Sequence, residues 1–96
     1  MLDDLWAAFF ATGDKKYVRE MIDVLPSAEV RGDVKRKLTG GAAQWSLGSN
    51  AYQHSRVLAI CEEAAKTSTG VKKRLLEEIV ERAKGERASN PPPEPK

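Results

Sequence analysis

The stretch GGAAQWSLGSNAYQHSRVL, residues 40–58, gathers glycine, alanine and serine around a tryptophan, a tyrosine and the single histidine of the chain. Small residues at successive helical positions remove side-chain bulk, so a neighbouring helix can approach closely. Large aromatic side chains fill the wider spaces beside such a contact. We therefore expect helix packing here, with Trp45 and Tyr52 in the interior. The small residues expected at the contact are Ala42, Ala43, Ser46, Gly48 and Ser49.

Length and composition set bounds on the fold and on the function. The chain has 96 residues, of which 41% are hydrophobic and 31% charged, which is typical of one globular domain with a modest core. Its net charge of +2 is too small to indicate a general nucleic-acid binder. Because Cys61 is the single cysteine, an internal disulfide is excluded and packing must supply the stability.

Apolar residues recur at helical spacing along the chain, and no segment alternates at the period of a strand. The spacing predicts helices over about 2–12, 14–25 and 27–38, a break at 39–41, and further helices that begin at Ala42, Ser55 and Val71. The predicted fold class is all-α: a bundle of five to six short antiparallel helices arranged as helical hairpins, with a short α-solenoid as an alternative.

We expect one helical domain over residues 1–85. From residue 86 the sequence reads ERASNPPPEPK, which lacks a large apolar side chain and ends in a proline-rich run. Such a composition predicts a flexible, Pro-rich C-terminal tail over 86–96.

The first two predicted helices form a hairpin, because only Gly13 and Asp14 separate them. This hairpin should bury Trp6 and either Phe9 or Phe10 against Val18, Met21 and Ile22. A shift of 39 positions places Trp6 on Trp45 and Val18 on Val57. Hairpins that recur after about 34–47 residues are typical of α-solenoid repeats.

Short segments resemble known repeat families. The segment AAQWSLGS resembles the inner helix of a HEAT-type unit, and FFATGDKKYV is similar to the turn of a tetratricopeptide or Sel1-like unit. The combination of LWAAFFATGDKKYV with AAQWSLGSNAYQHSRVL also resembles bacterial helical proteins of uncharacterised function, some of them exported. The resemblance covers most of residues 2–61. It implies a helical-repeat fold and transfers no functional site.

Candidate chemistry centres on His54, the one side chain that titrates near neutral pH without help. No second histidine or cysteine cluster supplies the ligands that zinc needs, so we expect neither a metal nor a cofactor. Cys61 falls on an apolar helix face, where thiols are mostly inert. We therefore expect a protein that is not an enzyme. The alternative is a ligand-binding or catalytic pocket in which His54 lies near Tyr52 or Gln53, an acidic residue and Cys61.

Basic residues cluster over 31–37 and 72–74, where acidic residues interleave with them. Mixed charges of this kind are typical of a solvated helix surface. We predict a protein–protein interaction module with an unidentified protein partner, with a homodimer as one version and weak nucleic-acid binding through the two basic clusters as an alternative. The residues expected on the partner-binding surface are Lys15, Arg19, Arg31, Lys35, Arg36, Lys72 and Lys73.

The apolar run LWAAFFA, residues 5–11, is too short to span a bilayer, and acidic residues precede it. We therefore expect no membrane insertion and no targeting segment in this chain. The sequence leaves the compartment open between the cytoplasm and, if a signal peptide has been removed, the periplasm.

Overall fold

The computed structural model describes residues 2–93, and over this range it contains helices and no strand. The all-α prediction is confirmed. In chain order the elements are α1 (Leu2–Thr12), α2 (Lys16–Asp23), the 3₁₀ helix η1 (Leu25–Glu29), α3 (Val34–Gln53), α4 (Ser55–Thr67) and α5 (Gly70–Ser89).

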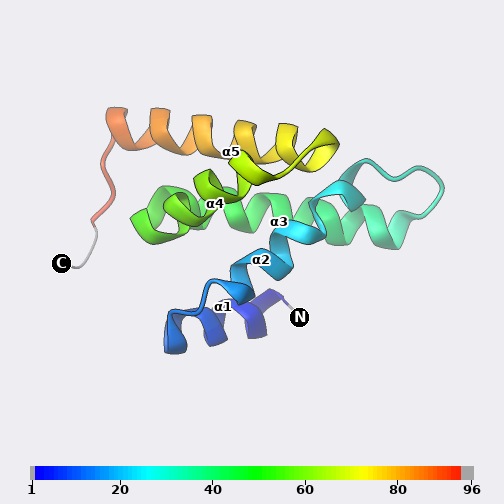
Figure 1. Cartoon of the computed structure of the whole chain (residues 1–96), viewed down its shortest axis with the longest axis horizontal. Coiled ribbons are helices and arrows are strands. Elements are labelled where there is room, and N and C mark those ends of the chain that lie inside the picture. The colour runs from blue at the N-terminus through cyan, green and yellow to red at the C-terminus, as the bar shows by residue number, and fades with distance from the viewer. Residues whose placement is uncertain (1, 94–96) are drawn as a thin grey trace.

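The three longest helices pack side by side along the long axis of the molecule (Figure 1). Helices α3 and α5 run in the same direction. Helix α4, which connects them in sequence, runs in the opposite direction. The hairpin of α1 and α2 lies below these helices in this view, with α2 in contact with both α3 and α4. The first turn of α3 projects beyond the start of α5.

The first hairpin forms as the sequence predicts. Gly13 adopts a positive φ of 72°, and its N–H donates to the Phe9 carbonyl at 2.7 Å, which ends α1. The Asp14 carboxylate then accepts from the Lys16 N–H at 3.0 Å at the start of α2. Arg56 of α4 donates to the Gly13 carbonyl and so ties the turn to the next layer. Trp6 and Phe9 are buried with Val18, Met21 and Ile22, whereas Phe10 is 51% exposed.

One core joins all the elements. Side chains at three- and four-residue spacing on each helix contribute to it, as expected for amphipathic helices. Leu25 brings η1 into the same core, and Leu75, Leu76, Ile79 and Ala83 bring α5. The largest fully buried side chains are Met21, Leu25, Leu47, Leu76, Val18, Val57 and Cys61.

The predicted helix over 27–38 and the predicted break at 39–41 are both wrong. Residues 25–29 form η1, Gly32 turns the chain with a φ of 82°, and Asp33 caps α3 by accepting from the Arg36 N–H at 3.0 Å. Helix α3 then continues without interruption to Gln53. Gly40 is buried where η1 crosses α3, and a Cβ on it would lie 2.1 Å from the Ala28 backbone nitrogen. Packing between backbones therefore outweighs the poor helix propensity of glycine.

Helix α5 continues four residues into the segment expected to be a tail. Its last turn is held by polar contacts to the end of α3. The Tyr52 hydroxyl donates to the Asn90 carbonyl at 2.5 Å, and Arg87 donates to the Tyr52 carbonyl at 2.6 Å. Residues 90–93 follow without helical structure, and the rest of the expected tail lies outside the described residues.

The Gly40 contact leads to a test in which the adjacent glycine is the control. We expect Gly40→Ala to lower the free energy of unfolding by about 1–3 kcal/mol, because the added methyl group must displace the η1 backbone. Gly41→Ala should raise it by up to about 1 kcal/mol, because no atom lies within 4 Å of the new Cβ. Urea unfolding of the two variants measures the difference, and equal effects would contradict this packing.

Candidate functional site

Helices α3 and α5 border a groove of about 610 Å³ on the surface of the molecule. Its floor is apolar, since Ile79 and Ala83 of α5 are buried there. Its rim is polar, and two ion pairs along α5 join Arg74 to Glu78 at 3.7 Å and Arg82 to Glu86 at 3.1 Å. The lining residues are Gly41, Gln44, Trp45, Gly48, Ser49 and Tyr52 from α3, with Glu78, Ile79, Arg82, Ala83 and Glu86 from α5.

Trp45 lies on this groove and is 76% exposed, so its predicted place in the interior is wrong. The core face of α3 is formed by Ala43, Leu47 and Ala51, which are fully buried. Trp45 lies two residues from both Ala43 and Leu47, which is about 200° around a helix, so it faces outward. Trp6, its equivalent under the 39-residue shift, is 8% exposed, so the two tryptophans occupy different environments.

A second stripe runs along α3 away from its core face, exposed at Val34, Leu38 and Trp45 and half-buried at its other three positions. Its members follow one another at intervals of four, three, four, three and four residues, which keeps them on one face in a heptad pattern. Val34 is 74% exposed and Leu38 is 68% exposed. We name this stripe the α3 seam; it consists of Val34, Leu38, Gly41, Trp45, Gly48 and Tyr52.

The two glycines of the α3 seam leave open space on either side of Trp45. No atom lies within 4 Å of a Cβ built on Gly41 or Gly48. The expected close helix contact at Gly48 is therefore absent, and the close approach occurs instead at Gly40, on the other side of the helix. The sequence stretch thus serves two purposes: Gly40, Ala43 and Ser46 pack inward, and the seam glycines shape the groove.

Three of the predicted surface cations bind carboxylates of other elements. Lys15 and Arg19 both contact Glu63 of α4 at 3.2 Å, and Lys72 contacts Asp23 at 3.0 Å. The hydrogen bond from Lys15, together with its charge, lowers the pKa of Glu63 below the ordinary value for glutamate. Arg19 and Lys72 also line a smaller cavity of about 360 Å³. These side chains therefore tie α2 to α4 and α5.

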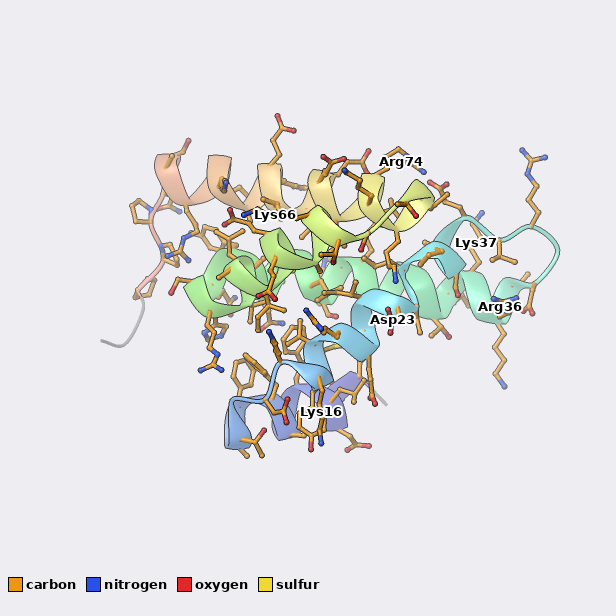
Figure 2. All side chains as sticks on the ribbon, in the orientation of Figure 1. Lys16, Asp23, Arg36, Lys37, Lys66 and Arg74 are labelled. Atoms are coloured by element: carbon orange, nitrogen blue, oxygen red, sulfur yellow. The ribbon has the colours of Figure 1, made fainter. Side chains whose placement is uncertain are left out.

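The other predicted cations lie in α5, in α3 and in the loop that precedes α3. Arg31, Lys35 and Arg36 are exposed at the projecting end of α3, and Lys73 is half-buried on α5. Figure 2 shows Arg36 and Lys37 at this end, away from the core. Among residues 2–93, no carboxylate oxygen lies within 4.0 Å of the charged groups of Arg31, Lys35, Arg36 or Lys37.

The His54 side chain contacts an aromatic ring and lines neither cavity. It lies at the junction of α3 and α4, with its ring centroid 4.9 Å from that of Phe10. Cys61 is fully buried, and desolvation, with a smaller contribution from Glu62, raises the pKa of its thiol to about 12. Tyr52 lines the groove instead of joining His54. Within the described range, no three or more His, Cys, Asp or Glu side chains form a group suited to a metal ion.

Comparisons with family models, curated proteins and solved structures find no significant match. The resemblance to HEAT, tetratricopeptide and Sel1-like repeats therefore stays a prediction from sequence patterns. None of the helices described for residues 2–93 combines the length and the apolar character needed to cross a membrane.

The two tryptophans should respond differently to truncation. We expect Trp45→Ala to change the free energy of unfolding by no more than about 0.5 kcal/mol, because the exposed side chain contributes little to the core. Trp6→Ala should cost about 3–5 kcal/mol, because it empties a buried site. Urea unfolding measures both variants. Acrylamide should quench the fluorescence of Trp45→Ala less than that of the wild-type chain, because the remaining Trp6 is buried. A destabilisation by Trp45→Ala as large as that by Trp6→Ala would place Trp45 in the core.

The Cys61 thiol should be inert in the folded chain. A pKa of about 12 leaves about one thiolate in ten thousand molecules at about pH 8, and burial blocks access to the sulfur. We expect no reaction with a disulfide reagent such as DTNB under native conditions and full reaction in concentrated urea. Because the pKa of the folded thiol lies above its ordinary value of about 9, the free energy of unfolding should also decline as the pH rises above about 9. Native reaction at the unfolded rate would contradict this burial.

Proposed function

We propose that the chain is a non-catalytic protein–protein interaction module that binds a helix of its partner in the groove between α3 and α5. The observation that carries the proposal is the exposure of Trp45 at the edge of an apolar-floored groove, between two glycines with open space above them. Tryptophan is enriched among the residues that dominate binding energy, where it fills or borders a pocket.

The α3 seam favours a helical partner. Helices that dock into grooves present anchors at i, i+3, i+4 and i+7, and the seam offers the complementary spacing. From Val34 to Tyr52 it extends about 27 Å along α3, which is long enough for about five turns of a partner helix. Side chains of the partner would enter the spaces over Gly41 and Gly48, on either side of Trp45.

The helical-repeat resemblance is compatible with this proposal, because α-solenoid units bind partners on exposed helix faces. A catalytic role at His54 requires an acid or a nucleophile at hydrogen-bond distance. Its ring instead contacts Phe10, and the Cys61 thiol is buried and protonated near neutral pH. These contacts favour binding over catalysis as the function of the chain.

The proposal is tested by affinity capture with matched aromatic truncations. The wild-type chain, Trp45→Ala and Phe10→Ala are used as bait in an extract of the source organism. Phe10 is a suitable control because it is a half-exposed aromatic residue on α1, outside the groove lining. We expect Trp45→Ala to reduce recovery of the captured partner about tenfold or more, as hot-spot truncations do, and Phe10→Ala to retain it.

Circular dichroism must first show that both variants are folded. Equal recovery with wild type and Trp45→Ala would contradict binding in the groove.

A further inference from the structure

We infer that the partner helix carries carboxylates on both sides of its apolar stripe, at the end that meets the first turn of α3. This inference rests on the proposed function. It comes from the charged residues that flank the α3 seam. These residues lie outside the lining of the groove.

Lys35 and Lys37 occupy the two positions that border the α3 seam. In its heptad, Leu38, Trp45 and Tyr52 take position a, while Val34, Gly41 and Gly48 take position d. Lys35 then falls at position e and Lys37 at position g. Charges at e and g form the interhelical salt bridges that select a partner in packed helix pairs. Two lysines at these positions therefore select carboxylates.

The selection is confined to one end of the seam. The next e and g positions are Ala42, Gln44, Ser49 and Ala51, which carry no charge. Acidic side chains of the partner are therefore needed only opposite residues 34–38. That turn is exposed on every side and projects beyond α5, so a second helix can reach it (Figures 1 and 2).

The free chain gains nothing from these cations. Among residues 2–93, no carboxylate lies within 4.0 Å of either Lys35 or Lys37, although Lys15 and Lys72 elsewhere are paired at 3.2 and 3.0 Å. Asp33 at the N-cap supplies one carboxylate to the positive end of the helix dipole. The first turn itself carries three cations, Lys35, Arg36 and Lys37, which oppose that dipole, and no acidic residue. Carboxylates from a partner would offset both unfavourable interactions.

A second copy of the chain does not supply these carboxylates through its own α3 seam. The flanking positions of that seam are Lys35, Lys37, Ala42, Gln44, Ser49 and Ala51, so pairing two seams would bring no acid to the lysines. The occupant we infer is therefore a different helix, apolar along one stripe and acidic beside one end of it.

The test uses two fluorescein-labelled helical peptides of about 21 residues. Both carry leucine at a and d, and they differ in having glutamate or lysine at the e and g positions of one end. Fluorescence anisotropy at about 50 mM salt measures binding to the wild-type chain. We expect the glutamate peptide to bind about tenfold tighter than the lysine peptide, and we expect the difference to shrink at about 0.5 M salt.

Charge reversal on the chain supplies the matched comparison. The double variant Lys35→Glu and Lys37→Glu should invert the preference, so that the lysine peptide binds tighter. Arg36→Glu makes the same kind of charge change on the opposite side of α3 and should alter the preference less than about twofold. The single variant Lys37→Glu should therefore shift the preference between the two peptides more than Arg36→Glu does. Equal shifts with these two single variants would overturn the inference.

The remaining outcomes separate this inference from the proposed function. If both peptides bind equally and Trp45→Ala weakens both, the groove binds helices and the charge selection is wrong. If neither peptide binds, the inferred partner chemistry is wrong, and affinity capture still decides the function of the groove.

Tighter binding to phosphatidylglycerol-containing vesicles or to duplex DNA than to the glutamate peptide would also overturn the inference. So would a dimer in sedimentation that Leu38→Ser abolishes.

Discussion

Helix α3 and η1 meet backbone to backbone at Gly40, where no larger residue fits. This contact and the buried row of Ala43, Leu47 and Ala51 fix the rotation of α3 about its axis. Once that rotation is fixed, the opposite face of the helix must point to solvent, because the helical period allows no other arrangement. The exposure of Trp45 is thus a consequence of how the core is packed.

The sequence predicts the first hairpin well, because its core side chains repeat at three and four residues within short helices. Trp6 and Val18 could therefore be assigned to the interior from spacing alone, whereas spacing left Phe9 and Phe10 as alternatives. The same reasoning fails in α3. Local propensity treats two adjacent glycines as a helix break, whereas tertiary contact with η1 makes the first of them necessary. The assumed break also hid the α3 seam, whose spacing continues unchanged across residues 39–41.

Contacts between distant segments account for the other differences. Glu63 lies 48 residues from Lys15, so no local pattern reveals that this lysine joins α2 to α4. The last turn of α5 has no large apolar side chain and reads as a tail, but the Tyr52 hydroxyl holds the Asn90 carbonyl. The sequence identifies which residues are charged or polar. The fold decides which of them already form ion pairs or hydrogen bonds within the chain.

The polar contacts at the end of the groove also bear on binding. The Tyr52 side chain is tied to Asn90, and its backbone carbonyl accepts from Arg87, so this end of the groove is held in place in the free chain. A site ordered before its partner arrives loses less conformational entropy on association. The first turn of α3 differs, because it projects without packing on its outer sides and its lysines have no carboxylate partner among residues 2–93. Affinity is therefore expected to come from the ordered Trp45 region, and selection among partners from the projecting turn.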